Sequence, residues 1–142
     1  EIKECDWSSD VCSSDLTING ALAVDLAGQV VADTISGTQF SGVGGHEDFV
    51  SGPGLSADGR SLICLPSAST VGGQLVTRIL PPLPAGSVVS TPRHQVDVVI
   101  TEWGAAELQG RTIRERALAL AAIGHPDVRD DLLAVATTWP KD

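Results

Sequence analysis

The sequence predicts one layered domain of the α/β or α+β class, and three observations support this prediction. The patterns along the 142 residues follow the order strands, glycine-rich loop, strands and two helices. Residues 95–101 form an almost continuous apolar run, which is typical of a strand covered on both faces. Residues 112–135 instead repeat apolar side chains at helical spacing.

The first sixteen residues differ from the rest of the chain. They lack the period of a helix or a strand and repeat Ser-Ser-Asp. A disordered acidic tail is one interpretation, and a metal or redox tail using Cys5 and Cys12 is another, although their C-x6-C spacing fits no common zinc pattern. A third explains more, because Cys5–Leu16 back-translates codon by codon to a sequence that resembles a widely used short-read sequencing adapter. We therefore treat residues 1–16 as a non-native, disordered tail and residues 17–142 as the protein domain, which is a fragment.

Charge and cysteine content narrow the classes of function. The chain has 9 Lys and Arg against 18 Asp and Glu, a net charge of −9, which becomes −5 once residues 1–16 are set aside. An acidic chain is not expected to bind nucleic acid or an anionic membrane, because both need a basic face. No apolar run has the length of a membrane span. Cys64 is the one cysteine outside the tail, which suits a cytoplasmic location.

Turn and strand patterns organise the chain up to residue 101. Residues 17–35 predict a β-hairpin, because two apolar runs flank Ala27-Gly28-Gln29 and Gly28 suits a tight turn. Residues 36–59 hold seven glycines and are expected to be rich in loops. The segment 67–73 is small and polar, and the proline-rich segment 81–84 is expected to be a rigid connector. Short strands are predicted at residues 61–65, 74–80, 87–90 and 95–101.

Helix signals organise the C-terminal part. Thr112 and Glu115 form a capping box, with Thr112 as the N-cap. Gly124 is a suitable stop for this helix. Pro126 fits the first turn of a second helix, where Asp127 interacts favourably with the helix dipole.

The glycine-rich segment 41–49 is the most informative stretch for chemistry. Its glycines would let backbone N–H groups approach a pyrophosphate or an oxyanion closely. It is neither a Walker A motif nor a dinucleotide fingerprint. A turn that needs positive φ angles is the alternative, and local pattern alone favours it.

Other candidate residues carry weaker signals. The His46-Glu47-Asp48 run lacks the spacing of a metal motif, so we expect no metal site. Cys64 lies in an apolar strand and is expected to be a buried small hydrophobe. The nucleophile elbow of a serine hydrolase is absent from the sequence.

Two polar residues lie in or next to predicted strands. Glu102 follows the strand 95–101, at the end where α/β sheets place ligands. A structural ion pair with Arg111 or Arg114 explains Glu102 equally well. Asn19 is polar within an apolar strand, and its pattern alone favours a turn or edge position.

Several short blocks, taken together and in order, support a resemblance. They lie at residues 18–21, 24–30, 41–45, 48–50, 65–67, 78–81, 98–104, 114–117 and 125–127. Their order and spacing resemble the C-terminal domain of the acetyl-CoA hydrolase/transferase family, which includes the 4-hydroxybutyrate and succinyl-CoA:acetate CoA-transferases. The resemblance covers essentially all of residues 17–142. It implies an α/β fold in which an open, mostly parallel sheet is flanked by helices.

The resemblance also implies a reaction. In this family a glutamate attacks the acyl-CoA thioester, coenzyme A then forms a glutamyl-CoA thioester, and a small carboxylate or water completes the transfer or hydrolysis. That nucleophile lies upstream of the Asn19 block, so no glutamate here is assigned to it. Asn19 and Glu102 are implied to line the active site in supporting roles. Gly42, Gly44, Gly45 and Gly52 are implied to approach coenzyme A or the thioester oxygen.

The implied partners are an acyl-CoA, a small carboxylate and an N-terminal domain that this sequence lacks. A homodimer is left open, and no nucleic acid, membrane or metal is expected. His46 and Gln109 stand where the family commonly has Gln and Arg, which leaves the acyl and acceptor preference open. A non-catalytic module of the same fold that binds coenzyme A or a nucleotide, and an interaction domain without a ligand, are the alternatives.

Overall fold

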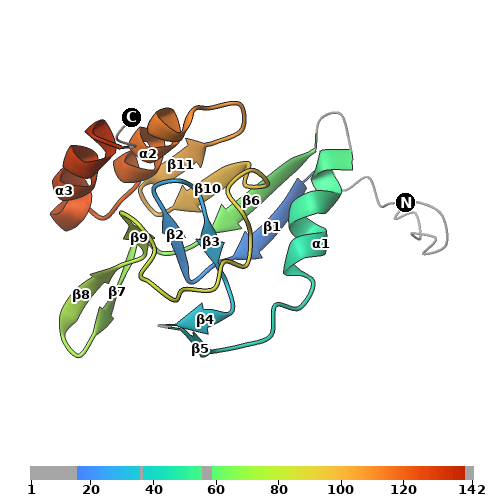
Figure 1. Ribbon diagram of the computed structural model, residues 1–142, viewed down its shortest axis with the longest axis horizontal. Helices are drawn as coiled ribbons and strands as arrows, with labels where there is room; N and C mark the ends of the chain where they lie inside the picture. Colours follow the sequence, from blue (N-terminus) through green and yellow to red (C-terminus); the bar gives the residue numbers. More distant parts are fainter. Residues whose placement is uncertain (1–15, 36, 56–58, 140–142) are drawn as a thin grey trace.

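The computed structural model describes residues 16–35, 37–55 and 59–139 (Figure 1). Residues 1–15 of the expected tail lie outside the described residues, and Leu16 is the first residue of a strand. Within the described part of the chain, no helix has the length and apolar character needed to cross a membrane.

The main sheet has four strands in the order β1-β6-β10-β11. They span Leu16–Gly20, Arg60–Cys64, Val98–Thr101 and Gly104–Glu107. β6 pairs in parallel with β1 and β10, and β11 is antiparallel to β10. The prediction of an open, mostly parallel sheet is therefore confirmed. β10 is almost entirely buried, as expected of a strand covered on both faces.

A second sheet of three short strands contains the predicted hairpin. β2 (Ala23–Asp25) and β3 (Val30–Val31) are antiparallel and turn at Gly28, which has φ +92°. The buried Asp25 carboxylate accepts from the backbone N–H groups of Ala27 and Gln29, which closes the turn. The hairpin is shorter than predicted, because residues 16–20 belong to the main sheet.

The predicted strand 74–80 is divided between two sheets. β8 (Gln74–Thr77) forms a hairpin with β7 (Ala68–Val71), whereas β9 (Ile79–Leu80) pairs with β2. The small polar segment 67–73 thus contains a strand that the sequence pattern did not predict. Gly72 and Gly73, both with positive φ, make the tight turn that lets β7 pair with β8.

The described residues of the loop-rich segment 36–59 include short regular elements, whereas the strand predicted at residues 87–90 was wrong. Residues 36–59 contain the short strand β5 (Thr38–Gln39), which pairs with β4 (Thr34–Ile35), then the helix α1 (His46–Ser51) and a 3-10 turn (Gly52–Leu55). Residues 87–90 are not a strand. Ser90 at its end donates its backbone N–H to the Val30 carbonyl, and the next residue, Thr91, forms an isolated bridge with Val30.

The two C-terminal helices confirm the sequence signals. α2 (Ile113–Ala122) begins with the complete capping box, and α3 (Pro126–Thr137) has its proline in the first turn. α2 packs on α3 and on β11, whereas α1 lies beside β1 at the opposite end of the main sheet (Figure 1). The core joins these layers through buried side chains that include Val24, Leu26, Val30, Ile63, Ile79, Val99, Leu108 and Leu120.

Candidate functional site

The carboxyl ends of three parallel strands meet at one edge of the main sheet. The register pairs Gly20 of β1 with Cys64 of β6, and Cys64 with Ile100 of β10. Asn19 therefore lies near the end of β1, and Glu102 follows directly after β10. This edge is where open α/β sheets bind ligands.

Asn19 lines a cleft of about 350 Å³ at this edge. The cleft is formed by Ile18, Asn19, Gly20, Ala32, Val43, Gly45, His46 and Phe49. The Asn19 Nδ2 atom is buried and has no hydrogen-bond partner among the described residues. Leaving a buried amide donor unpaired costs about 1–3 kcal/mol of folding free energy. A ligand oxygen that accepted from this nitrogen would remove that cost.

The glycine-rich loop brings one further unpaired donor, that of Gly45, to the same cleft. Gly45 lines the cleft, and Gly42 and Gly44 precede it in the exposed loop. None of the three backbone N–H groups has a partner among the described residues. Gly44 has φ +57°, so the turn interpretation is correct for this glycine. Gly42 has neither a positive φ nor a neighbour that a Cβ would meet, so the fold itself does not require glycine there.

Gly52 lies apart from the cleft. It follows the last residue of α1 with helical dihedral angles and opens the 3-10 turn. It is not among the residues that line the cleft around Asn19.

His46 is the buried titratable group of the cleft. It is the first residue of α1, and its Nε2 lies 2.8 Å from Thr91 Oγ1. Burial lowers the pKa of His46, against smaller opposing effects of Glu47 and Asp33. Across the described residues, no three His, Cys, Asp or Glu side chains gather as they would around a metal ion.

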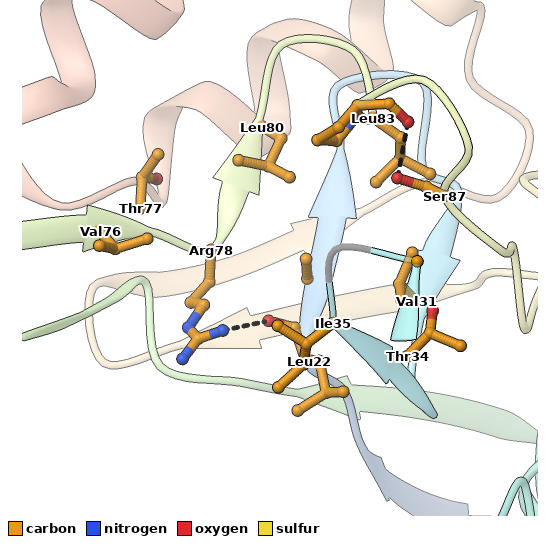
Figure 2. Close-up of a pocket in the computed structure, with 13 residues that line it drawn as sticks. Leu22, Val31, Thr34, Ile35, Val76, Thr77, Arg78, Leu80, Leu83 and Ser87 are labelled. Carbon is orange, nitrogen blue, oxygen red and sulfur yellow. Dashed lines mark hydrogen bonds between the residues drawn. The ribbon is translucent and has the colours of Figure 1, made fainter. Parts of the chain in front are cut away.

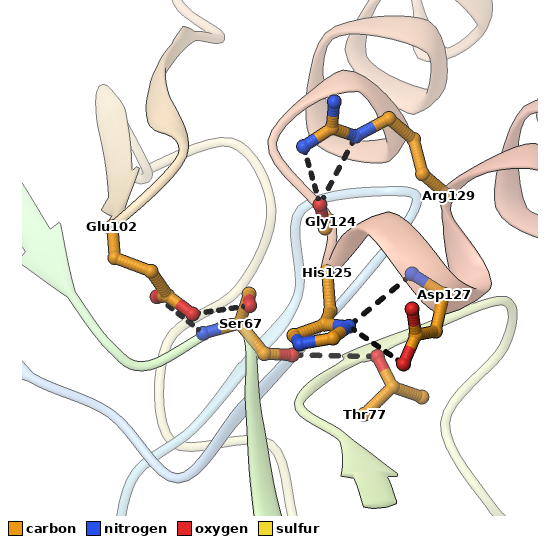
Figure 3. A network of polar contacts seen from close by, with 7 residues as sticks. All are labelled: Ser67, Thr77, Glu102, Gly124, His125, Asp127 and Arg129. Carbon is orange, nitrogen blue, oxygen red and sulfur yellow. Dashed lines mark hydrogen bonds and ion pairs between the residues drawn. The ribbon is translucent and has the colours of Figure 1, made fainter.

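Glu102 is held by a serine rather than by an arginine. Its Oε2 accepts from the Ser67 backbone N–H at 2.9 Å, and its Oε1 accepts from Ser67 Oγ at 2.5 Å (Figure 3). These hydrogen bonds lower the pKa of Glu102. The alternative interpretation, an ion pair with Arg111 or Arg114, is not realised among the described residues.

An aromatic and cationic cluster adjoins Glu102. The Trp103 ring is half-exposed, meets His125 edge-on at a centroid distance of 6.0 Å, and lies 5.7 Å from the Arg129 guanidinium carbon. Arg129 also donates twice to the Gly124 carbonyl, at 3.1 and 3.0 Å (Figure 3). These contacts give Trp103 a defined orientation next to the carboxylate.

The structure brings only some of the predicted residues together. Asn19 and Gly45 share the cleft, whereas Glu102 is separated from β1 by the intervening strand β6. Ser67 was missed as a partner of Glu102. Its signal is its place just after the strand 61–65, which neighbours β10. Cys64, expected to be buried, is half-buried.

A second pocket, of about 220 Å³, contains none of the predicted site residues. Figure 2 shows mainly apolar side chains from β3, β4, β8 and β9 around it, with Arg78 at one end. One Arg78 nitrogen reaches the Leu22 carbonyl at 3.5 Å.

Comparison with known proteins shows which family the chain belongs to. Residues 12–136 match the family described as the acetyl-CoA hydrolase/transferase C-terminal domain. The chain belongs to this family. The resemblance drawn from the short sequence blocks is thereby confirmed, and Asn19, the glycine-rich loop and Glu102 all lie inside the matched region.

Several enzymes of this acetyl-CoA hydrolase/transferase family are close in sequence. The 4-hydroxybutyrate coenzyme A transferase of Clostridium kluyveri is 47% identical over 118 residues, covering 83% of this chain and 27% of that protein. The butyryl-CoA:acetate CoA-transferase of Anaerostipes caccae is 44% identical over 119 residues, with the same two coverages. The chain thus spans about a quarter of the length of these relatives.

Solved structures agree with the family assignment. RipA from Yersinia pestis superposes with a TM-score of 0.75 at 39% identity, over 87% of this chain and 27% of that one. The 4-hydroxybutyrate CoA-transferase from Porphyromonas gingivalis gives a TM-score of 0.62 at 38% identity, over 82% and 24%.

Proposed function

We propose that this domain forms one wall of the active site of an acyl-CoA:carboxylate CoA-transferase or acyl-CoA hydrolase. The observation that carries the proposal is the pair of unpaired donors on residues that line the cleft, namely Asn19 Nδ2 and the backbone N–H of Gly45, with the unpaired N–H groups of Gly42 and Gly44 in the adjoining loop. Such donors stabilise an oxyanion that forms when a thioester carbonyl is attacked.

The reaction follows the covalent route of the family. A glutamate upstream of this sequence attacks the thioester carbonyl and releases the coenzyme A thiolate, which leaves an acyl-glutamyl anhydride. The thiolate then attacks the anhydride, releases the first carboxylate and forms a glutamyl-CoA thioester. An incoming carboxylate attacks this thioester, which forms a new acyl-glutamyl anhydride and expels the thiolate; the thiolate then attacks the acyl carbon of that anhydride, which forms the new acyl-CoA and frees the glutamate. Water that attacks the glutamyl-CoA thioester instead releases coenzyme A and the glutamate, which gives hydrolysis. Glu102 acts beside these groups as a fixed, ionised acceptor.

The glycine-rich loop contributes close backbone approach to coenzyme A or to the thioester oxygen. Gly42 supports this role, because neither its φ angle nor its surroundings require a glycine. The absence of a side chain there leaves space in which a ligand can approach the backbone. The position of Gly52 away from the cleft gives it no part in the proposed site.

The substrates we propose are an acyl-CoA and a small carboxylate, in a cytoplasmic enzyme. Related proteins carry names that specify butyrate, acetate, succinate and cyclohexane-1-carboxylate as partners. This range matches a site in which the domain recognises the thioester and its oxyanion rather than one acyl chain.

An Asn19→Leu substitution tests the proposal in the enzyme completed with its native upstream sequence. Removing one oxyanion donor is expected to lower kcat for acyl-CoA:acetate exchange by about 100-fold or more. Folding should persist, because the lost nitrogen has no partner in the described structure. An exchange rate within about twofold of the unmodified enzyme, at equal melting temperature, would contradict the proposal.

Calorimetry and activity assays on the same completed enzyme distinguish catalysis from binding alone. Coenzyme A that binds in calorimetry without any exchange or hydrolysis would favour the non-catalytic binding module. A chain that neither binds nor reacts would instead be an interaction domain.

A further inference from the structure

Ser67 uses both of its donors on one carboxylate. Its backbone N–H and its hydroxyl each take a different oxygen of Glu102, at 2.9 and 2.5 Å. The two residues are 35 positions apart and follow adjacent parallel strands, β6 and β10. A pair of hydrogen bonds to two oxygens fixes the rotation as well as the position of a carboxylate.

Ser67 is itself immobilised by its surroundings. It is 0% exposed, although Glu102 lies at the surface. Its carbonyl accepts from the Arg78 backbone N–H at 2.8 Å and from Thr77 Oγ1 at 3.4 Å (Figure 3). The junction of β8 and β9 therefore holds the serine in place.

The backbone next to Glu102 is anchored in the same manner. The Thr101 hydroxyl donates to the Ile123 carbonyl at 2.7 Å and accepts from the Trp103 backbone N–H at 3.1 Å. Thr101 is buried, so the turn after β10 has a defined course. Hydrogen bonds of the buried residues Ser67 and Thr101 therefore fix the backbone on both sides of the contact between Ser67 and Glu102.

The contact also determines the charge of Glu102. Donors to the carboxylate favour its ionised form, and Ser67 is the largest cause of the lowered pKa of Glu102, with His125 as a smaller one. An ionised carboxylate has about four acceptor positions, of which Ser67 occupies two. The backbone of Glu102 itself adds a weaker contribution of the same sign, the exposed side of the carboxylate can accept from substrate, and the group has no proton to donate at neutral pH.

We propose that Ser67 is a positioning residue of the CoA-transfer reaction, which orients Glu102 and keeps it a hydrogen-bond acceptor. The catalytic part of this inference rests on the proposed function. The effect of Ser67 on Glu102 is a property of the fold, so it can be measured without any activity.

The first experiment is a titration of Glu102 by carbon-detected NMR, in the 142-residue chain and in its Ser67→Ala variant. Glu102→Gln identifies the Glu102 resonance. Ser67→Ala should raise the pKa of Glu102, because one of its two donors is lost. Ser67→Cys keeps the buried volume with a weaker donor, and should give a smaller upward shift even if the alanine variant folds poorly.

Ser61→Ala is the matched control. Ser61 is also a buried serine, at 3% exposure, but its hydroxyl has no partner among the described residues. Its removal should leave the Glu102 titration unchanged. Equal Glu102 titrations in the Ser67→Ala, Ser67→Cys and unmodified chains would overturn the proposal.

The second experiment uses the enzyme completed with its native upstream sequence. Ser67→Ala should lower kcat by about 10- to 100-fold, the loss that follows removal of a hydrogen bond to a charged group. It should also move the acid limb of the pH profile to higher pH, because activity requires ionised Glu102. A kcat loss without that movement would indicate a structural role and would overturn the proposal. If the unmodified enzyme lacks activity, the proposed function fails while the titration still decides the role of Ser67.

Discussion

Single polar side chains at the sheet edge differ in whether their hydrogen-bonding groups are occupied. Glu102 receives two donors from Ser67, whereas the Asn19 amide nitrogen has none among the described residues. The first arrangement stabilises a charge before substrate arrives, and the second leaves a donor for a charge that develops later. His46 is a third case, a buried imidazole next to one hydroxyl, that of Thr91.

His46 should make the stability of the fold depend on pH. Its pKa in the folded chain lies below the ordinary value of 6.5, because burial disfavours the charged form. Its contribution is therefore complete above about pH 6.5 and is lost as the pH falls from there toward the folded pKa, since the unfolded chain binds the proton more readily. Thermal melting between pH 7.5 and 5.5 measures this loss.

His46→Gln should reduce the decrease in Tm over that pH range, because glutamine does not titrate. His94→Gln is the control, since His94 is exposed and should leave the decrease unchanged. Equal pH dependence in the two variants would contradict the assigned role of His46.

Local elements of this domain are specified to different degrees. The capping box of α2 and the turn at Gly28 form where their sequence signals predict them, because both depend on contacts within about four residues. The helix α1 was not predicted, since a run of six residues after glycines has no measurable helical period. Its position is determined by packing against β1 and β6.

Thr112→Ala should destabilise the domain by about 1 kcal/mol, the usual cost of losing an N-cap side chain. The Thr112 hydroxyl accepts from the Glu115 backbone N–H at 3.3 Å, and the Glu115 carboxylate accepts from the Thr112 backbone N–H at 2.8 Å. Urea unfolding provides the measurement. Arg114→Ala, on the exposed face of the same helix, should change stability by less than about 0.5 kcal/mol. Equal losses in both variants would show that the cap contributes nothing.

At the scale of the whole molecule, the domain supplies one wall of the site that we propose. The unpaired Asn19 amide and the fixed Glu102 carboxylate lie at the same edge of the main sheet, whereas no glutamate of this chain is assigned as the nucleophile. The chain spans about a quarter of its relatives. The remaining catalytic groups are therefore expected from the rest of the enzyme.

We expect the purified 142-residue chain to show no exchange of label between acetyl-CoA and acetate. The same assay on the enzyme completed with its native upstream sequence should show exchange, because that sequence contains the proposed nucleophile. Exchange catalysed by the short chain alone would show that the nucleophile lies within these residues.

The sequence by itself determined the class of fold, the hairpin turn, the two C-terminal helices and the family. Each of these depends on local periodicity, on capping residues or on short blocks in a recognisable order. Asn19 and Glu102 could be named as candidates from the same blocks. Their partners could not, because hydrogen bonds between distant positions depend on strand order and register.

The tertiary structure alone decided which polar groups are paired. Ser67 meets Glu102 because β6 and β10 are parallel neighbours, and no arginine forms an ion pair with Glu102 among the described residues. It also divided the predicted strand 74–80 between two sheets, since Arg78 marks a change of pairing partner that apolar pattern does not encode. Contacts made across a sheet follow from how strands are arranged in space, and residue spacing along the chain does not specify that arrangement.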